Sequence, residues 1–553
     1  MREPHYSHAA PRIYPFHPHG HHVPVLPLTE HLNAVLPALL VGLAAGILAL
    51  LFLRAASLRW SWALFALPLA PLLWVIGWQL GLAVGLASAL AAGGGLYWHL
   101  EDTYRGGEEA RRVRDALGPL EFARARLAER RAGGERVGKG GLALGVTPSG
   151  RICRVPFGSE QGVHALVLGA TGSGKTVTQA AIAQSYVRAG MGAIVLDPKG
   201  DPYLRAVLRN AARAAGVALR EWSPTGPGIY NPFARGGPTE VTDKALAGHR
   251  WSEPHYELAT QRLLGMVTAT IRAAGQWPPT LSGLVRYMDP DRLDAFAAQV
   301  GGSLAATVAS YVEGLSGRGR ADLGGGRDRL AVLAEGELGR WLDPAIGKGP
   351  ELDLMGSLRR GEVVYFHIDS DRYPAASRLL GAALVIDLVT LTADMQGGEL
   401  HGLAVIDEFA ALAAEHVHRL FGRARSAGLS VLLGTQSLAD LRTARPDDPT
   451  DSLTEQVLTN VAYVVAHREA DPDSAERLAR VVGTEPSWTT TTKVGSRREN
   501  WWSRAEGSRT PDRQFVIPPD HFKRLSTGCA VVIQPTAKRP GEVVRIAQPE
   551  GER

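Results

Sequence analysis

Two charge-free runs near the N-terminus constrain this chain more than any other feature. No Asp, Glu, Lys or Arg occurs between Glu30 and Arg54, and none occurs from Trp60 to Leu100. An apolar helix needs about 20 residues to cross a bilayer. Both runs exceed that length. The sequence therefore predicts a transmembrane region over residues 34–100 and argues against a purely soluble protein.

The number of spans stays open at this level. Residues 34–53 make one span, but residues 61–98 would make a helix far longer than the ~30 Å hydrocarbon layer. They fit one tilted helix that continues out of the membrane, or two short spans that turn near Gln79–Gly81. The two Arg residues of the loop 54–59 favour its cytoplasmic placement and hence three spans. The tight turn that this requires favours two.

The segments on either side of the spans have contrasting compositions. Residues 1–33 are rich in His and Pro, and their histidines have no Cys or acidic partner at ligand spacing. A disordered tail is therefore favoured over a metal-binding tract. Residues 101–138 mix Arg and acidic residues in nearly equal number, with apolar residues every three to five positions. That pattern is typical of a solvated helical connector.

The overall charge and the cysteines limit the function classes. The formal net charge is +5, which is too small for a protein that coats nucleic acid, so any such contact must be local. The two cysteines provide no disulfide framework and fit a reducing compartment.

The strongest motif is GATGSGKT at residues 169–176, which matches the phosphate-binding loop in full. A short apolar strand pattern precedes it and a helical pattern follows. The backbone of this loop would curl around a phosphate at a helix N-terminus; the residues concerned are Gly169, Ala170, Thr171, Gly172, Ser173 and Gly174. Lys175 would reach the β- and γ-phosphates of ATP, and Thr176 would offer its hydroxyl to Mg²⁺.

A second motif supplies carboxylates. The apolar run of LAVIDEF (403–409) is typical of a buried parallel strand that ends at Asp407 and Glu408. Asp407 would hold Mg²⁺ through water, and Glu408 would act as the general base for the attacking water. Two acids after an apolar strand are common, but beside a phosphate-binding loop they indicate ATP hydrolysis.

Further strand patterns indicate that the two motifs belong to a larger sheet. A strand over residues 430–434 ends at Thr435 and Gln436, and we expect Gln436 to contact the γ-phosphate. Four more strand patterns fit a parallel sheet, at 192–196, 363–368, 463–467 and 529–534. Between residues 238 and 350 helical spacing replaces strand patterns. Residues 317–329 (GRGRADLGGGRDR) are expected to form a flexible loop that either contacts a phosphate backbone or is simply solvated.

Taken together, these residues resemble the type IV secretion coupling proteins, the TraG/TraD-like motors of conjugation in the FtsK–HerA class. The resemblance covers roughly residues 140–550. It rests on the phosphate-binding loop, DPKGD (197–201), YNPF (230–233), WSEPHYE (251–257), LAVIDEF, RSAGLSVLLGTQSLADL (425–441) and the stretch 513–533.

The resemblance implies an α/β fold: a RecA-like P-loop NTPase with a mostly parallel sheet, an inserted all-α domain and N-terminal transmembrane helices. The motor would comprise residues 139–236 and 350–553, and the insertion residues 237–349. It also implies Arg425 as the best candidate for an arginine finger acting across a subunit interface. The loop between the first spans is short and no long acidic tail follows the last strand, so an extracytoplasmic domain and tail-mediated recruitment are not expected.

The implied function is that of a homo-hexameric ATPase in the bacterial inner membrane, with its motor in the cytoplasm. It would couple ATP hydrolysis to the passage of DNA, usually single-stranded and bound to a relaxase, into a type IV secretion channel. Two other functions stay open. A double-stranded DNA translocase of the FtsK/HerA type would carry a winged-helix reader, for which the roughly 20 residues after Gln534 leave no room. A docking receptor for exported proteins would share the same motor motifs.

Overall fold

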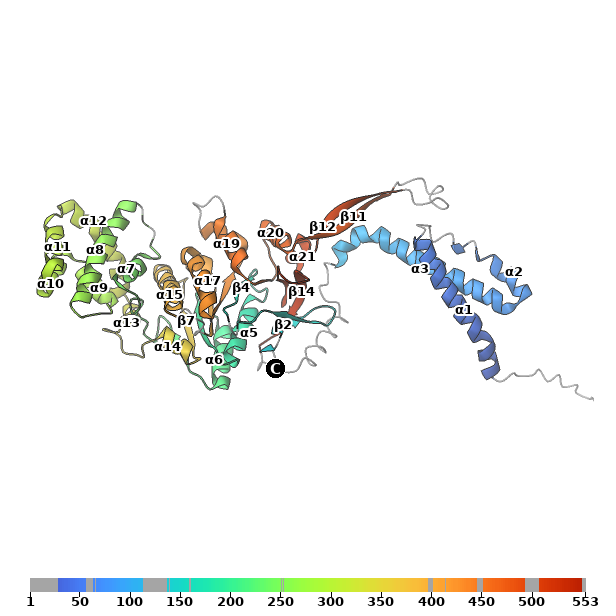
Figure 1. The fold of residues 1–553 in the computed structure, drawn as a ribbon, viewed down its shortest axis with the longest axis horizontal. Helices are drawn as coiled ribbons and strands as arrows, with labels where there is room; N and C mark the ends of the chain where they lie inside the picture. The colour runs from blue at the N-terminus through green and yellow to red at the C-terminus, as the bar shows by residue number, and fades with distance from the viewer. Residues whose placement is uncertain are drawn as a thin grey trace, which may run out of the picture. The chain divides into compact units, whose positions relative to one another are not determined.

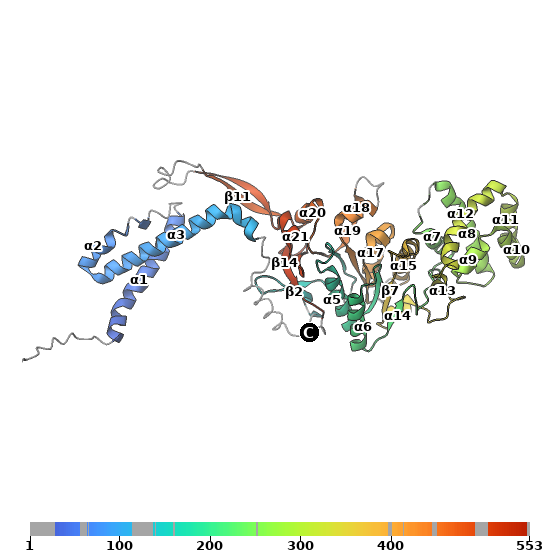
Figure 2. The same ribbon diagram turned by 180° about the vertical axis from the view of Figure 1, so that it is seen from behind.

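Three helices form the apolar N-terminal region of the computed structural model (Figures 1 and 2): α1 (Leu28–Ala55), α2 (Leu69–Ile76) and α3 (Trp78–Arg112). The structure describes residues 28–55, 63–64, 66–112, 137–138, 140–158, 161–249, 251, 253–395, 401–412, 414–444, 451–492 and 507–549. The charge-free run 61–98 is not one continuous helix, because Gly77 ends α2 in an extended conformation.

The predicted charged connector is only partly described. Its first residues continue α3 as far as Arg112, and residues 113–136 lie outside the described residues. At its end Val137–Gly138 forms strand β1, which pairs with β2 (Gly141–Val146), so the helical prediction is wrong for these two residues.

Helices α1 and α3 pack through small residues and run in the same direction. A Cβ atom added to Gly42 would lie 2.8 Å from the Ala83 carbonyl oxygen, and one added to Gly46 would lie 2.9 Å from the Leu90 Cβ. Further along, one added to Gly94 would lie 2.9 Å from a Leu50 methyl group. Such close approach through small residues is typical of membrane helix pairs. Because contacts advance along both helices together, α1 and α3 are parallel.

Helix α2 runs the opposite way. A Cβ atom on Gly81 of α3 would meet Ala70 and Trp74 of α2 at 2.7 and 2.9 Å, and one on Gly85 would meet Ala70. Helix α2 therefore packs antiparallel against the first turns of α3, and the chain reverses direction between them at Gly77. Windows at Val35–Leu53 and Trp78–Tyr97 are long and apolar enough to cross a membrane, whereas α2 has only eight residues.

A twelve-stranded sheet forms the centre of the remaining chain. Seven strands run parallel, in the order β10-β4-β9-β8-β5-β7-β6. Their bounds are β4 His164–Leu168, β5 Gly192–Asp197, β6 Leu219–Trp222, β7 Val363–His367, β8 Gly402–Ile406, β9 Leu429–Thr435 and β10 Tyr463–Ala466. All carboxyl ends of these strands therefore meet at one edge, which is where loops bind ligands in such sheets.

The other strands are antiparallel, which corrects one expectation. Residues 529–533 form β13 (Cys529–Ile533), which runs antiparallel to β10 and not parallel as the pattern suggested. Beyond it lie β14 (Gly541–Ile546), β2, β1 and β3 (Ile152–Val155). An apolar run alone does not encode strand direction, because a buried strand has the same composition in either orientation.

Helices cover both faces of the sheet. Helices α5 (Lys175–Arg188) and α6 (Pro202–Ala215) pack against the strand side chains on one face of the sheet and form one hydrophobic core with them. Helices α15 (Pro374–Asp394), α16 (Phe409–Leu412), α17 (Ala414–Ala427) and α19 (Ser452–Asn460) pack with the other set. Although α15 is apolar enough to cross a membrane, 78% of its apolar window is buried inside the protein. It is a core helix.

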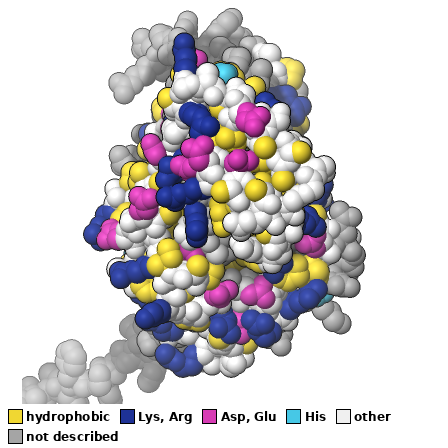
Figure 3. Space-filling model, turned by 90° about the vertical axis from the view of Figure 1, so that its left-hand side faces the viewer, with side chains coloured by type: hydrophobic (Ala, Val, Ile, Leu, Met, Phe, Trp, Pro, Cys, Tyr) yellow, Lys and Arg dark blue, Asp and Glu magenta, His cyan; other side chains and the backbone are white. Residues whose placement is uncertain are grey.

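An all-helical region follows β6, as the spacing predicted. Its helices are α7 Pro238–Leu246, α8 Pro254–Ala273, α9 Leu281–Tyr287, α10 Pro290–Val300, α11 Gly302–Glu313, α12 Gly317–Glu335 and α13 Gly339–Leu342. Figure 3 faces this region and shows basic, acidic and apolar side chains intermixed over it, without a field of one sign.

The expected Gly/Arg loop at 317–329 is instead helix α12. Ser316 caps it by accepting a hydrogen bond from the Gly319 N–H at 3.0 Å. Gly326 lets α12 approach α8, since a Cβ there would lie 2.3 Å from the Thr260 hydroxyl oxygen. Arg320 pairs with Asp291 at 2.8 Å. Tertiary packing here overrides the low helix propensity of glycine.

The rest of the motor comprises short elements: α14 Leu354–Arg359, α18 Leu438–Ala444, α20 Pro472–Val482, α21 Pro519–Arg524 and the hairpin strands β11 Thr484–Thr492 and β12 Gly507–Phe515.

A buried ion pair joins the helical region to the motor. Lys244 on α7 and Asp387 on α15 form a salt bridge with side chains 0% and 2% exposed. Lys244 also donates to the Arg235 carbonyl at 2.7 Å, and the Tyr230 hydroxyl of YNPF donates to the second Asp387 oxygen. Each charged group thus has several partners, which a buried charge requires.

We expect removal of either partner to destabilise the fold more than removal of both. Lys244→Met or Asp387→Leu leaves an unpaired buried charge and should cost about 3–5 kcal/mol of unfolding free energy. The double variant should lose markedly less unfolding free energy than the two single variants lose together. Denaturant titrations of the detergent-solubilised chain measure these losses. Arg480→Met, which breaks an exposed pair with Glu476, is the matched control and should cost under about 1 kcal/mol. Additive losses would contradict a coupled pair.

Candidate functional site

The loop between β4 and α5 has the backbone geometry of a phosphate cradle. Gly169, Gly172 and Gly174 adopt φ values of +153°, +74° and +112°, which favour glycine. A Cβ at Gly169 would lie 2.5 Å from the His467 Cβ, whereas one at Gly172 would face open space. No side chain caps α5 and its first turn holds no acidic residue. Its N-terminal N–H groups are therefore placed to receive an anion.

The underside of this loop rests on His467, which follows β10 and is fully buried. Its ring contacts the Thr178 hydroxyl through Nε2 at 2.8 Å and the Cys529 carbonyl through Nδ1 at 3.1 Å. Burial lowers the pKa of His467 to about 4, so the ring is neutral at physiological pH. Since a carbonyl only accepts, Nδ1 carries the proton and Nε2 accepts from Thr178.

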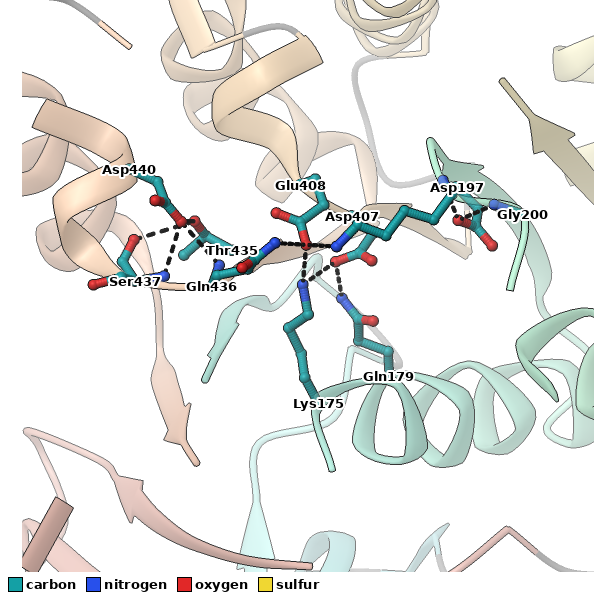
Figure 4. A network of polar contacts seen from close by, with 11 residues as sticks. Lys175, Gln179, Asp197, Gly200, Asp407, Glu408, Thr435, Gln436, Ser437 and Asp440 are labelled. Atoms are coloured by element: carbon teal, nitrogen blue, oxygen red, sulfur yellow. Dashed lines mark hydrogen bonds and ion pairs between the residues drawn. The ribbon is translucent and has the colours of Figure 1, made fainter. Parts of the chain in front are cut away.

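The acids predicted to act together meet the loop lysine. Asp407 and Glu408 follow β8, and Lys175 Nζ lies 2.9 Å from Asp407 Oδ1 and 2.8 Å from Glu408 Oε1. Figure 4 shows the three side chains converging. Burial opposes the charge on Lys175, but the two carboxylates outweigh it and raise the pKa of Lys175. Glu408 has a positive φ of 46°, a strained conformation for a non-glycine residue.

Strand β9 lies between β4 and β8 and brings Gln436 to the same point. Gln436 Nε2 donates to Glu408 Oε1 at 3.1 Å. The loop after β9 is ordered by Asp440, whose Oδ2 accepts from the Thr435 hydroxyl and from the N–H groups of Gln436 and Ser437 (Figure 4). Gln436 is thus held beside the carboxylate by a fixed turn.

Asp407 has a second donor and little space around it. Gln179 on α5 donates from Nε2 to Asp407 Oδ1 at 2.9 Å. A Cβ at Gly434 of β9 would lie 2.2 Å from both of these atoms. Glycine at this position therefore permits the aspartate and the glutamine to meet across the strand.

The structure brings most of the predicted residues together, but not Arg425. The loop 169–174, Lys175, Thr176, Asp407, Glu408 and Gln436 all lie at the carboxyl edge of the parallel strands. Arg425 is exposed and precedes β9, so it lies at the amino edge, where its carbonyl accepts from the Gly162 N–H at 3.0 Å.

Sequence reasoning assigned no role to three residues at this site: Gln179, Lys199 and His467. Lys199 Nζ lies 2.8 Å from Glu408 Oε1. It belongs to DPKGD, which follows β5, and β5 neighbours β8. Polar residues just after a parallel strand lie at the ligand edge, so this position was a usable signal.

The oxygen donors fit a hard cation bound together with phosphates. Asp407 and the Thr176 hydroxyl are the ligand types that Mg²⁺ prefers, and the buried Ser173 hydroxyl in the loop has no protein partner. Among the described residues no group of three His, Cys, Asp or Glu side chains is placed to hold a metal alone. A Mg²⁺ ion here would accordingly take most of its ligands from phosphates and water.

Two family models match parts of the chain. Residues 401–527 match the model described as the TraM recognition site of TraD and TraG. Residues 161–212 match the model described as the central domain of helicase HerA. No curated protein sequence matches the chain.

Several solved structures share the fold. The conjugative coupling protein TrwB lacking its N-terminal 70 residues aligns at a TM-score of 0.55 and 18% identity, covering 77% of this chain and 93% of that one. TrwB with a non-hydrolysable ATP analogue aligns at 0.52 and 19%, covering 76% and 91%. TrwB with ADP and Mg²⁺ aligns at 0.50 and 19%, covering 70% and 87%. The fold is thus that of a P-loop NTPase of the coupling-protein type, preceded by apolar helices.

We expect Gly434→Ala to weaken Mg–ATP binding about tenfold, because the added methyl group must displace Asp407 or Gln179 and such overpacking costs about 1–3 kcal/mol. Calorimetric titration of the solubilised chain measures this. Gly265→Ala on α8 is the control, since nothing lies within 4 Å of its added Cβ, and it should bind as the wild type does. Unchanged affinity in Gly434→Ala would separate this strand from the nucleotide site.

Proposed function

We propose that this chain, which is TraG/TraD-like in the C-terminal family model that it matches and in its fold, is a membrane-anchored ATPase that moves DNA into a conjugative type IV secretion channel. One observation carries the proposal. The glycine-rich loop after β4, the Glu408 carboxylate after β8 and Gln436 after the intervening strand β9 share one site.

The residues at this site divide the work of hydrolysis. Lys175 exchanges its carboxylate partners for the β- and γ-phosphates of ATP, while the α5 N-terminus and the loop N–H groups bind the phosphate oxygens. Thr176 and Asp407 would hold Mg²⁺, which supplies positive charge beside the phosphates. Glu408 accepts a proton from the attacking water, and Gln436 orients its carboxylate.

We further propose that Arg425 acts on the site of a neighbouring subunit in a homo-hexamer. In its own subunit Arg425 is exposed at the amino edge of the sheet, away from the phosphate cradle. A cation supplied in trans can stabilise the charge that develops on the transferred phosphoryl group. This role makes hydrolysis depend on subunit contact.

Single-stranded DNA and a relaxase are the proposed cargo, and channel components are the proposed partners. The match to the TraM recognition model supports contact with a DNA-processing complex. The intermixed charge of the helical region (Figure 3) speaks against broad coating of DNA and for a local grip. A double-stranded DNA translocase and a protein-docking receptor remain the alternatives that the following assay separates.

The solubilised chain should release phosphate from ATP slowly alone, faster with single-stranded DNA and less so with duplex. Glu408→Gln should lower turnover by about 10²-fold or more and still bind Mg–ATP, because only the base is lost. Lys175→Ala should lose both turnover and Mg–ATP binding.

Phosphate release and analogue binding, measured side by side, provide the test. Arg480→Met, remote from the site, should behave as wild type. Equal rates with single-stranded, double-stranded and no DNA would sink the DNA-motor proposal and leave the protein-docking receptor.

We propose three passages through the bacterial inner membrane, with the motor in the cytoplasm. The parallel packing of α1 and α3 supports this proposal, because two parallel spans would need a return passage between Ala55 and Trp78. The loop that holds Arg54 and Arg59 then lies on the same side as the charged end of α3, as the positive-inside rule favours. The His-rich N-terminus lies on the opposite side.

Matched cysteine variants test this topology. In spheroplasts, a membrane-impermeant maleimide should label Ser7→Cys directly and Ser57→Cys only after permeabilisation. The native Cys153 and Cys529 are buried and give a low background. The reverse labelling pattern would establish two passages with both ends inside.

A further inference from the structure

The DPKGD segment after β5 forms a turn that is built around one buried carboxylate. Asp197 is 1% exposed, and its Oδ1 accepts from the N–H groups of Lys199 and Gly200 at 2.9 and 2.8 Å. Its Oδ2 accepts from the Asp201 N–H at 2.7 Å and the Tyr365 hydroxyl at 2.6 Å. Four hydrogen bonds to one side chain fix the backbone on both sides of Lys199.

The turn is also held from both neighbouring elements. Gly200 has a φ of +68°, and a Cβ there would lie 2.1 Å from His367 Nε2 at the end of β7. Asp201 caps α6 by accepting from the N–H groups of Tyr203 and Leu204. A lysine that only faced solvent would need no such support.

The ammonium group of Lys199 reaches the proposed general base. Its Nζ lies 2.8 Å from Glu408 Oε1, with the lysine side chain 49% exposed and the glutamate side chain 13% exposed. The same oxygen receives Lys175 Nζ at 2.8 Å and Gln436 Nε2 at 3.1 Å. Figure 4 shows Lys175, the first residue of α5, and Gln436, which follows β9, both reaching Glu408.

A bound nucleotide would affect the three donors to Glu408 differently. Lys175 belongs to the phosphate-binding loop, so bound phosphates compete for it with Glu408. Without both lysines, Glu408 would be a mostly buried carboxylate on a strained backbone, facing only the amide of Gln436. Lys199 comes from the β5 turn, outside the loop, and remains in place when Lys175 leaves.

We propose that Lys199 is a positioning residue that takes over Glu408 when Lys175 turns to the nucleotide, and that it keeps this carboxylate aimed at the attacking water. The inference rests on the proposed ATP hydrolysis and deepens it. It assigns the DPKGD segment the task of linking β5 to the catalytic carboxylate.

The split between turnover and binding distinguishes this role from a structural one. The ammonium group of Lys199 lies 2.8 Å from Glu408 Oε1 and comes from the β5 turn, outside the phosphate-binding loop. Its loss should therefore lower kcat and leave nucleotide affinity in place, whereas a loss of structure would lower both.

The experiment compares Lys199→Met, Lys199→Arg and wild type in the solubilised full chain. Lys199→Met should lower kcat at pH 7 on the order of tenfold, a part of what general-base catalysis contributes. It should leave affinity for a non-hydrolysable ATP analogue within about twofold. Lys199→Arg should restore most of kcat, since it restores the positive charge beside Glu408. Lys348→Met, at an exposed lysine, is the control and should match wild type.

Each other outcome decides against the proposal. An unchanged kcat in Lys199→Met, measured beside a wild-type chain that hydrolyses ATP, overturns this inference alone. Loss of analogue affinity in proportion to kcat assigns Lys199 to binding or folding instead. If Lys199→Met does not fold, Lys199→Gln provides the same comparison. A wild-type chain that does not hydrolyse ATP overturns the proposed function and this inference together.

Discussion

The contact between Lys175 and the carboxylates of Asp407 and Glu408 is the interaction on which this molecule depends. It joins the first helix after β4 to the end of β8 across the intervening strand β9. Three charges with little exposure are stable there only because each has several partners, including Gln179, Gln436 and Lys199. Bound phosphates would compete with these two carboxylates for the Lys175 ammonium group.

Two further constraints connect this site to the rest of the chain. Because Gly434 has no side chain, Asp407 and Gln179 can meet beside it. The geometry of the site therefore depends on the packing of strand β9. The buried pair Lys244 and Asp387 ties the helical region to α15, which lies under the sheet.

The sequence predicted which side chains would converge better than it predicted their surroundings. Lys175 was recognisable from the glycine-rich loop before it, and Asp407, Glu408 and Gln436 from the short apolar strands that they follow. Helix α12 was missed because its glycines have low helix propensity, and only the packing of Gly326 against Thr260 explains why they are there. The direction of β13 was missed because composition does not encode orientation. Lys199 was overlooked although it follows β5 at the carboxyl edge of the sheet, because the order of the strands, which places β5 beside β8, is a tertiary feature.

By itself, the sequence determined the apolar N-terminal helices, the phosphate-binding loop and the acids after β8, because these are local patterns in which periodicity and glycine placement dictate the backbone. The tertiary structure decided everything that depends on which elements become neighbours. It set the parallel register of α1 and α3, the insertion of β9 between β4 and β8, and the placement of Arg425 at the edge opposite the nucleotide. These follow from packing between segments far apart in the chain, and no local pattern records which distant surface a segment will meet.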